Sequence, residues 1–599
     1  MKKTQFLKNF FTLQLSLLIF LFSFSQKKPL DHSVNDSWQS IGERMISNNG
    51  KWVVYTICPQ IGDTTLVIES SDAKYKREIE HSKNAVITED SRFLIFKIRP
   101  WYKDLREAWI KKKKPDEMPK DSLGIVELGK DDVWKLANVK SYKTPEKAAG
   151  WVAYQMEKEK NVSKENENIA GSDLILRQTI NGKEKIFKNV SDYYFNKSGR
   201  KLLLLTAKAS KDSLSKIYVL LYDLRVGVID TLSRGGNEFR NFTITDDGSQ
   251  VAFIAERDAA PKALQKFYKL WYFKEGMDSA IMLVDKNSVG MMLGMTVSEF
   301  GQVDFSKSGR RLFFGVAPIE PPKDTSLIDI DLVKVDIWNY KDDYLQTVQT
   351  NPNHLRNDLQ QNYLAVYDLQ SNTIKQLGNE KIPQVIQTNE GDGETFVGVT
   401  DFGKRIESQW LGDTRKDIYA IDVKTGNKKL VKENLHGFIY PSSTGKYIMW
   451  YDRGAKNYFV SDGTTTRSIT SKIKVPLWNE DFNNPDFPPP YGVMGWSERD
   501  SSVYVYDKYD AWKVDMNSKI NPVLITNGRK TKIISRYIQL DPEKRYVDLN
   551  TAIFRRVNDV TKESAYFPFF KGDDFSGKLQ KYSFGFPAKA KNEFSYIYT

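Results

Sequence analysis

Short runs of aliphatic and aromatic residues, each introduced by a polar turn, recur along the chain from residue 40 onward. A representative copy is Asn49-Gly50-Lys51-Trp52-Val53-Val54-Tyr55, in which a turn is followed by a basic residue and then by strand-forming residues. Gly, Asn, Asp and Ser favour tight turns, whereas branched and aromatic residues favour strands. We call this pattern the turn phrase. Its other copies have their turns at residues 91, 199, 248, 309, 445 and 500, with a weaker copy at Gly393.

The spacing of the turn phrases sets the size of the repeated unit. Successive turns are 41, 108, 49, 61, 136 and 55 residues apart. If the two long gaps each hold two or three units, one unit has roughly 40–60 residues, the size of a four-stranded propeller blade. The sequence therefore predicts an all-β fold: a β-propeller of seven to eight four-stranded blades, with room for an incomplete last blade and with no α/β-hydrolase domain.

A second pattern, which we call the hairpin phrase, joins two strands through an acidic residue. Leu221-Tyr222-Asp223-Leu224 leads into a strand that ends at Leu232, and Val366-Tyr367-Asp368-Leu369 leads into one that ends at Leu377. Related copies contain Asp422, Asp515 and Glu127. We expect the hairpin between the outer strands of a blade here. The acids are predicted to bond to nearby backbone amides rather than to catalyse a reaction.

Two regions interrupt the repeat. Residues 101–120 are highly charged and contain Lys111-Lys112-Lys113-Lys114, which indicates a solvated insertion or a short helix rather than a binding arm. Residues 476–491 are rich in Pro and Asn and contain Pro488-Pro489-Pro490, which is typical of a loop between blades.

The first 25 residues have the pattern of a secretory signal peptide. Lys2, Lys3 and Lys8 precede an apolar run from Phe10 to Phe24. Small residues stand three and one positions before a cleavage point ahead of Gln26. An uncleaved membrane anchor is the alternative, but the run is short for a span. The sequence thus predicts a signal peptide at 1–25 and an exported propeller at 26–599, periplasmic or secreted, with no stable membrane insertion after signal removal.

Composition narrows the class of protein. Of 599 residues, 40% are hydrophobic and 13% aromatic, which is typical of a globular chain. The single cysteine, Cys58, excludes an intramolecular disulfide framework and any multi-cysteine metal site, and we expect it to be structural. The formal net charge is +13, but acids and bases are interspersed. This favours a generic basic surface over a nucleic-acid-binding stripe.

The sequence contains no recognisable catalytic motif. The nearest relative of Gly-x-Ser-x-Gly is Gly495-Trp496-Ser497-Glu498-Arg499, which lacks the last glycine and lies in a turn phrase. His-Glu-x-x-His, phosphate-loop and dinucleotide-binding motifs are absent. Asp342-Asp343 is interpreted as a solvated turn. The four histidines, which lie far apart in the sequence, are His32, His81, His354 and His436. We therefore assign no catalytic, cofactor-binding or metal-binding residue and no cofactor.

Several longer phrases, taken in their order, resemble one family. The most specific are Tyr491-Gly492-Val493-Met494-Gly495-Trp496 and Tyr506-Asp507-Lys508-Tyr509-Asp510-Ala511-Trp512-Lys513-Val514-Asp515. They are preceded by Asp31-His32-Ser33-Val34-Asn35-Asp36-Ser37-Trp38, Met118-Pro119-Lys120-Asp121-Ser122-Leu123-Gly124-Ile125 and Val335-Asp336-Ile337-Trp338-Asn339-Tyr340. From residue 27 to 599 the chain is similar to the N-terminal portion of exported serine peptidases of the prolyl oligopeptidase family, of the type found in Bacteroidetes.

This resemblance implies a propeller that filters or positions peptides, followed in the family by an α/β-hydrolase domain carrying Ser, Asp and His. The family's catalytic residues would lie in that domain, so none is carried onto this sequence. The dipeptidyl-peptidase branch of the family uses paired glutamates to hold a peptide amino terminus, and no Glu-Glu pair occurs here. No substrate-binding residue is carried over either.

Three hypotheses follow. The first is a non-catalytic, substrate-gating propeller portion of such a peptidase, from a truncated, split or frameshifted gene, with peptides or a downstream hydrolase domain as partners. The second is a stand-alone envelope propeller that binds proteins, resembling the TolB-like group. The third is a propeller enzyme with facing carboxylates in its channel, such as a lyase or glycosidase. If the last blade is incomplete, an open sheet edge would cause aggregation or dependence on a partner chain.

Overall fold

The computed structural model describes residues 31–158, 171–208 and 215–569, apart from positions 261, 323, 329, 332, 334 and 336, and also residues 588–589 and 596–597. The signal peptide predicted at residues 1–25 lies outside these ranges. No helix within them is long and apolar enough to cross a membrane.

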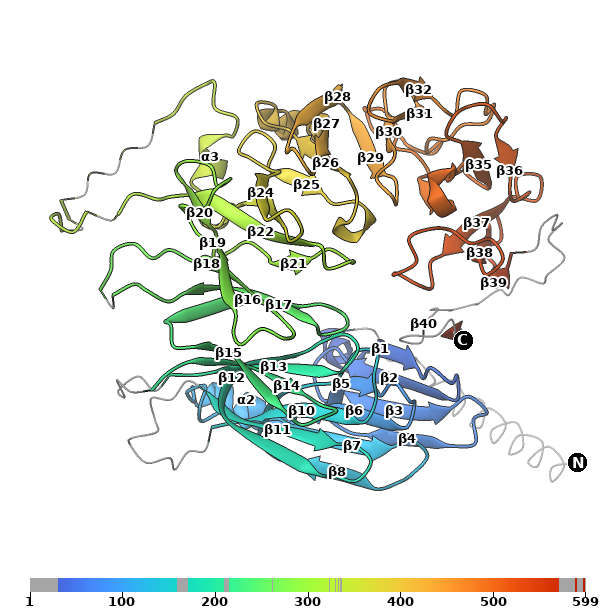
Figure 1. Cartoon of the computed structure of the whole chain (residues 1–599). Helices are drawn as coiled ribbons and strands as arrows, with labels where there is room; N and C mark the ends of the chain where they lie inside the picture. Colours follow the sequence, from blue (N-terminus) through green and yellow to red (C-terminus); the bar gives the residue numbers. More distant parts are fainter. Residues whose placement is uncertain are drawn as a thin grey trace, which may run out of the picture. The chain divides into compact units, whose positions relative to one another are not determined.

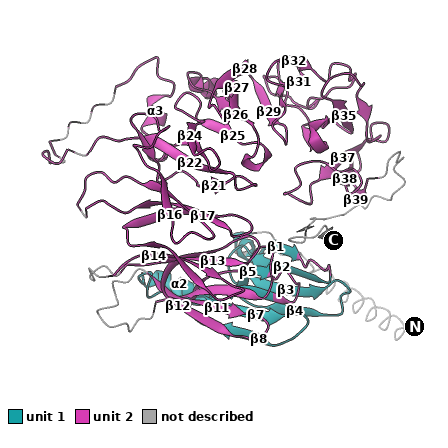
Figure 2. Cartoon of the chain, in the orientation of Figure 1, with its two compact units in different colours: residues 1–45, 51–86, 94–138 teal, residues 46–50, 87–93, 139–599 magenta. Residues whose placement is uncertain are grey.

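The chain divides into two compact units (Figure 2). The first comprises residues 1–45, 51–86 and 94–138, and the second comprises residues 46–50, 87–93 and 139–599. The first unit is built on two four-stranded antiparallel sheets (Figure 1). Their strands are β1 (Gln39–Ile46), β2 (Trp52–Pro59), β3 (Thr65–Ser70) and β4 (Lys76–Ile79), and then β5 (Ser82–Ile87), β6 (Phe93–Ile98), β7 (Ser122–Glu127) and β8 (Val133–Leu136).

The charged insertion at 101–120 contains a short helix, as predicted. Helix α2 (Tyr102–Ile110) connects β6 to β7. The side chains of Lys111-Lys112-Lys113-Lys114 that follow it are exposed. A short 3-10 helix, η1 (His32–Ser37), precedes β1.

The second unit begins with a seven-stranded sheet that is two four-stranded units sharing one strand. Its long strand β12 (Glu184–Phe195) pairs with β11 up to Val190 and with β13 from Val190 onward, and the register shifts at that point on both sides. The other strands are β9 (Val139–Lys143), β10 (Trp151–Met156), β11 (Ser172–Gln178), β13 (Lys201–Thr206), β14 (Tyr218–Asp223) and β15 (Ile229–Arg234).

Four-stranded antiparallel sheets then follow one another along the chain, each with its strands in sequence order. The first is β16 (Glu238–Ile244), β17 (Gln250–Glu256), β18 (Lys269–Lys274) and β19 (Ile281–Val284). In the next, β20 (Met295–Val297) and β21 (Asp304–Phe305) both pair with β22 (Arg311–Pro318), which continues to β23 (Tyr363–Asp368) and β24 (Thr373–Gln376).

Three further sheets of this kind and one smaller sheet complete the described part of the unit. They are β25 (Gln384–Ile386), β26 (Thr395–Thr400), β27 (Lys416–Asp422) and β28 (Lys428–Leu435); β29 (Gly437–Pro441), β30 (Ile448–Asp452), β31 (Asn457–Ser461) and β32 (Thr466–Ser468); β33 (Val493–Trp496), β34 (Ser502–Tyr506), β35 (Ala511–Asp515) and β36 (Val523–Leu524); and the three-stranded β37 (Ile533–Ile538), β38 (Ile553–Asn558) and β39 (Ser564–Pro568). Two-residue strands β40 (Ala588–Lys589) and β41 (Tyr596–Ile597) pair with each other.

Short helices lie in the connections between these strands. They are α3 (Gln346–Gln349), α4 (Pro352–Leu359), α5 (Ser408–Leu411), η2 (Asn389–Gly391), η3 (Arg405–Glu407) and η4 (Glu498–Asp500). The Pro-rich segment 476–491 lies between β32 and β33 and has no strand, as predicted for a loop between sheets.

Neighbouring sheets of the second unit pack face to face, which explains the apolar runs in second strands such as β13, β17 and β30. In β17, for example, Val251 and Phe253 pack with residues of the preceding sheet, whereas Ala252 and Ile254 pack with residues of the following one. A strand covered on both faces reads as continuously apolar instead of alternating. This is the arrangement of blades in a β-propeller, so the predicted fold class is confirmed.

The number of blades differs from the prediction. The described residues contain nine four-stranded units and the three-stranded one, so the predicted seven to eight blades are exceeded. One turn between a first and a second strand was not recognised in the sequence. It precedes β10, where Ala148-Ala149-Gly150-Trp151 has alanines in place of the usual polar turn residues. The sheet of β37, β38 and β39 has three strands within the described residues.

Both phrases have the positions expected of them. Every turn phrase lies between the first and second strands of a sheet, and every hairpin phrase lies between the third and fourth. Asp223 accepts hydrogen bonds from the amides of Arg225 (2.8 Å) and Val226 (3.3 Å). Burial alone would raise the pKa of Asp223, but these amides and the Lys201 ammonium outweigh it and lower the pKa to about 2. The hairpin acids are turn residues, as predicted.

Candidate functional site

The connections between first and second strands are bonded to one another across the sheets of the second unit. We call these connections, residues 144–150, 196–200, 245–249, 306–310, 387–394, 442–447 and 497–501, the rim. Consecutive members are joined by Lys147 N to Lys197 O (2.9 Å), Ser198 N to Asp246 O (3.0 Å), Lys307 Nζ to Asp246 Oδ2 (2.7 Å), Lys307 N to Glu390 O (3.0 Å), Asn389 N to Ser443 O (3.0 Å) and Thr444 N to Asp500 Oδ2 (2.9 Å). Each turn therefore fixes the position of the next.

A buried arginine strengthens one of these joints. The Arg311 side chain is 1% exposed and donates from Nη1 to the carbonyls of Gly391 (3.2 Å) and Gly393 (2.6 Å). Its Nη2 donates to Glu394 (2.8 Å). A charge buried without such partners would be costly, so these acceptors are what make the buried position tolerable.

The last sheet departs from this pattern because its first-to-second connection, residues 539–552, is much longer than any rim turn. We call this segment the crossing loop. Glu543 in the loop accepts from Lys147 Nζ at Oε2 (2.6 Å) and from Lys197 Nζ at Oε1 (2.7 Å). Arg545 forms an ion pair with Glu390 (3.7 Å), and its carbonyl accepts from Ser443. The crossing loop thus contacts four different rim turns, which belong to three sheets.

The two lysines set the charge state of Glu543. The hydrogen bond from Lys147, followed by that from Lys197, lowers the pKa of Glu543 to about 2. Burial lowers the pKa of Lys197, but the contacts with Glu543 and Glu146 outweigh it and raise the pKa above its usual value. At neutral pH, Glu543 and Lys197 are both charged. Each retains substantial contact with solvent, so the individual ion pairs are weak.

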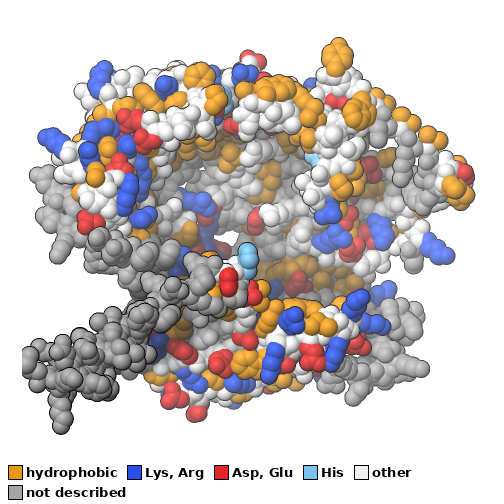
Figure 3. Space-filling view, turned by 180° about the vertical axis from the view of Figure 1, so that it is seen from behind, with side chains coloured by type: hydrophobic (Ala, Val, Ile, Leu, Met, Phe, Trp, Pro, Cys, Tyr) orange, Lys and Arg blue, Asp and Glu red, His pale blue; other side chains and the backbone are white. Residues whose placement is uncertain are grey.

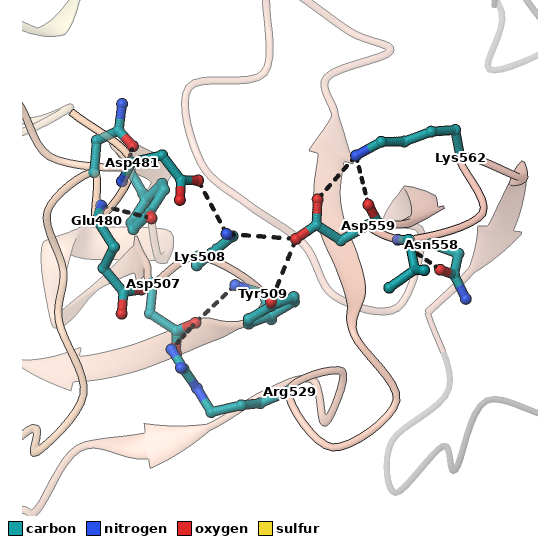
Figure 4. A network of polar contacts seen from close by, with 12 residues as sticks. Glu480, Asp481, Asp507, Lys508, Tyr509, Arg529, Asn558, Asp559 and Lys562 are labelled. Atoms are coloured by element: carbon teal, nitrogen blue, oxygen red, sulfur yellow. Dashed lines mark hydrogen bonds and ion pairs between the residues drawn. The ribbon is translucent and has the colours of Figure 1, made fainter. Parts of the chain in front are cut away.

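A polar network at the strand ends opposite the rim holds the sheet of β37, β38 and β39, which bears the crossing loop, against the preceding sheet (Figure 4). Lys508, in the short turn between β34 and β35, pairs with Asp481 (2.9 Å) and with Asp559 (3.4 Å). Tyr509 donates from its hydroxyl to the same Asp559 carboxylate (3.3 Å). Asp559 follows β38, so these contacts tie the two sheets together.

Asp507 is the buried centre of this network. Its carboxylate accepts from Trp512 Nε1 (2.7 Å), from Arg529 Nη2 (3.0 Å) and from the amide of Tyr509 (2.8 Å). Arg536, on β37, donates to the carbonyls of Asp507 (3.2 Å) and Lys508 (3.1 Å). Burial lowers the pKa of Arg536. The phrase Tyr506–Asp515 is therefore a structural joint between the sheet that bears the crossing loop and the preceding sheet.

A cavity of about 590 Å³ lies beside the contact between Lys197 and the crossing loop. The residues that line it come from the ends of β9, β12 and β16 and from the rim turns that follow these strands. They are Lys143, Thr144, Glu146, Tyr194, Phe195, Asn196, Lys197, Phe242, Thr243, Ile244 and Asp246. The Tyr194 and Phe242 rings lie 5.9 Å apart, and Lys143 Nζ lies 4.3 Å from the Tyr194 ring centroid. Aromatic and charged groups of both signs therefore meet in one concave site.

Most of the candidates that the sequence singled out prove to be structural where the chain is described. Ser497 is a turn residue, because its Oγ accepts from the Ser502 amide (2.9 Å) and bonds to the Ser501 hydroxyl (3.1 Å). Cys58 is half-buried on β2. Within the described residues, no group of His, Cys, Asp and Glu is arranged to hold a metal ion.

One interpretation was wrong. Asp343 is not a solvated turn residue: its carboxylate accepts from the amides of Gly403 (2.8 Å) and Arg405 (2.7 Å) and so anchors a helical connection far along the sequence. Asp342 is closer to the expectation, since it accepts from the Asn339 amide (3.3 Å) in a local turn. The sequence offers no signal for the difference, because the partners are some sixty positions away.

No pattern in the sequence pointed to Lys147, Lys197 and Glu543. None of them belongs to a motif, and the contact between Lys147 and Glu543 joins positions 396 residues apart. The unusual length of the last turn was the one signal available, and it is visible only once the strands that flank it are known.

Comparisons with known proteins return structures alone. No protein-family profile matches the chain, and no curated protein matches it. The β-propeller domain of the trilobed protease from Pyrococcus furiosus is similar over 67% of this chain and 97% of its own, with 12% identity and a TM-score of 0.27. Porphyromonas gingivalis dipeptidyl peptidase 4 is similar over 70% of this chain and 58% of its own, with 14% identity and a TM-score of 0.31. The tricorn protease is similar over 90% of this chain and 57% of its own, with 11% identity and a TM-score of 0.25.

Proposed function

We propose that this chain is the substrate-gating, non-catalytic propeller portion of an exported serine peptidase of the prolyl oligopeptidase type. The phrases at 491–496 and 506–515 support the family. The signal-peptide pattern at 1–25 supports export. The single observation that carries the gating role is the crossing loop, which reaches over the rim from a sheet that is held firmly against its neighbour.

A gate requires a support that stays in place and contacts at its moving tip that are weak enough to break. The crossing loop has both. At the end of its sheet opposite the loop, Asp507 is buried, Arg536 is half-buried and both are multiply hydrogen-bonded, so the sheet that bears the loop stays in place. At the tip of the loop, Glu543 and Arg545 are held by partly exposed ion pairs, each worth about 0.2–1 kcal/mol. Such pairs are weak enough for a peptide to displace.

A stand-alone binding scaffold is the second candidate, and the cavity beside Lys197 favours it. The reading frame downstream of this chain separates the two. A frame that encodes Gly-x-Ser-x-Gly followed by Asp and His supports the peptidase, whereas an unrelated gene supports the scaffold. A nucleic-acid partner fits neither, because Lys and Arg are interspersed with Asp and Glu on the face drawn in Figure 3.

Hydrogen exchange tests the gating role directly. The purified chain is incubated with a mixture of peptides, and amide exchange is followed by mass spectrometry. We expect faster exchange across residues 539–550 when peptide is present, and no hydrolysis of peptides or acyl esters by this chain. If no peptide changes amide exchange in the crossing loop and the chain instead retains a folded protein partner, the gating role is contradicted and the binding scaffold is supported. Hydrolysis that follows the chain through every purification step would contradict the non-catalytic assignment.

A further inference from the structure

The Glu543 carboxylate bonds to two lysines, one of which lines the cavity. Its two oxygens accept separately, one from Lys147 Nζ (2.6 Å) and the other from Lys197 Nζ (2.7 Å). Lys197 also lines the cavity, whereas Glu543 belongs to a segment that enters from the last sheet. A carboxylate held between two ammonium groups is the geometry that an incoming carboxylate would reproduce.

The cavity wall next to these lysines suits an apolar group. Tyr194 and Phe242 lie with their rings 5.9 Å apart and tilted by 32°, and both are partly buried against the core of their sheets. The Tyr194 ring is held from two sides: Lys143 Nζ lies 4.3 Å from its centroid, and its hydroxyl donates to Asp192. A preformed aromatic wall orders few side chains on binding, which favours affinity.

We propose that this cavity binds a carboxylate-bearing peptide, with Lys147 and Lys197 holding the carboxylate in place of Glu543 and with Tyr194 and Phe242 contacting the neighbouring apolar side chain. The peptide nature of the ligand rests on the proposed function. Glu543 is then an internal substitute for the ligand: it occupies the lysines when the site is empty and releases the crossing loop when a peptide takes its place.

The volume and the charge balance of the site agree with this assignment. About 590 Å³ accommodates one or two residues of a peptide. Asp246 also lines the cavity, but its shortest ion pair is with Lys307 (2.7 Å) and not with Lys147 or Lys197. The exchange of one carboxylate for another leaves the net charge of the site unchanged, so Lys147 and Lys197 keep a shared carboxylate in addition to the more distant Glu146, which lies 3.9 Å from Lys197 Nζ.

The test measures peptide binding by fluorescence anisotropy with the full chain. Three labelled pentapeptides serve as probes: Gly-Gly-Ala-Ala-Phe with a free carboxyl terminus, the same peptide amidated, and amidated Gly-Gly-Glu-Ala-Phe. We expect the free-acid peptide to bind at least about tenfold more tightly than its amide, because charge-assisted hydrogen bonds are lost on amidation. Equally tight binding of the glutamate peptide would identify a side-chain carboxylate as the source, and weak binding would identify the terminal carboxylate.

Variants of the two partners should change this affinity in opposite directions. Glu543→Gln removes the internal competitor and should tighten binding of the free-acid peptide about fivefold, whereas Lys197→Gln should weaken it about tenfold. The ion pair between Lys188 and Asp173 (2.5 Å) supplies matched controls, because neither residue lines the cavity. Lys188→Gln and Asp173→Asn should alter affinity less than twofold, and the melting temperature of each variant verifies its fold.

The outcomes separate this inference from the gating role. Equal affinity for acid and amide, or unchanged affinity in both Glu543→Gln and Lys197→Gln, overturns the carboxylate site. If peptide still accelerates exchange of the crossing loop in that case, gating stands and the binding site lies elsewhere. If no variant binds any peptide, the site and the gating role both fail.

Discussion

The two ends of the strands in the second unit differ in how their connections behave. The rim turns are short and uniform, as at 196–200, 245–249 and 306–310, and they are hydrogen-bonded to one another. The opposite ends, where second strands lead to third strands, carry connections as long as 319–362 and 401–415. A turn that must fit its neighbours cannot vary much, whereas a connection that faces solvent can lengthen at little cost in free energy. This is why the turn phrase repeats and no comparable phrase marks the other end.

The crossing loop is an exception to this contrast between short rim turns and long connections at the opposite strand ends. It stands at the rim end, yet it is long. Instead of bonding only to the next turn, it reaches four rim turns of three sheets through Glu543 and Arg545. The comparison therefore predicts large effects from changes in the buried network that holds the sheet bearing this loop, intermediate effects at the tip of the loop and small effects in the long, exposed connections.

The largest effect is expected at Asp507. Asp507→Ala leaves Arg529 and the Trp512 indole without their acceptor in a buried site. Breaking a buried ion pair costs about 3–5 kcal/mol, and because Arg529 is 35% exposed and regains contact with water, we expect the lower end, about 3 kcal/mol, so thermal unfolding should begin well below that of the wild type. Asp481→Ala is the matched control, because Asp481 is 71% exposed and also contacts Lys508. A fall in melting temperature as large for Asp481→Ala as for Asp507→Ala would show that the sheet bearing the loop is not held by the buried centre of the network.

A smaller and more local effect is expected at the tip of the crossing loop. Glu543→Gln removes two partly exposed ion pairs, worth together about 1 kcal/mol, without touching the core. Trypsin should then cut after Lys544 and Arg545 about fivefold faster, while the melting temperature changes little. Asp173→Asn, which breaks an ion pair distant from the loop, should leave the cleavage rate unchanged. Unchanged cleavage in Glu543→Gln would mean that Arg545 alone holds the loop.

Acid should loosen the same contact through protonation. The pKa of Glu543 in the folded protein is lowered to about 2 from an ordinary value of 4.5, so its contribution is fully present above the ordinary value. It is lost as the pH falls from about 4.5 toward 2. Hydrogen exchange at residues 539–550, corrected for intrinsic rates, should therefore lose protection over this range in the wild type. In Glu543→Gln the protection should already be low at pH 6 and should change less on acidification.

The sequence predicts local features better than long-range ones, and the reason is physical. The turn and hairpin phrases are encoded within ten or so residues, because glycine turns and amide-bonding acids act locally, as at Gly199 and Asp223. Contacts such as Lys147 with Glu543 or Asp343 with Arg405 depend on the path of the whole chain. The turn between β9 and β10 was not recognised because Ala148 and Ala149 replace the polar residues that define the turn phrase.

The smallest effect is expected in the long connection between β22 and β23. Trp338 there is 75% exposed, although it belongs to one of the longer phrases singled out in the sequence. Trp338→Ser should change the free energy of unfolding by no more than about 0.5 kcal/mol, because an exposed side chain gives up little burial. Trp496→Ser is the contrast: Trp496 ends β33, is 6% exposed and should cost about 3–5 kcal/mol when truncated. Denaturant titrations of both variants measure the difference. A cost at Trp338 comparable to that at Trp496 would mean that this connection packs against the fold as the rim turns do, and the contrast between the two ends of the strands would no longer hold.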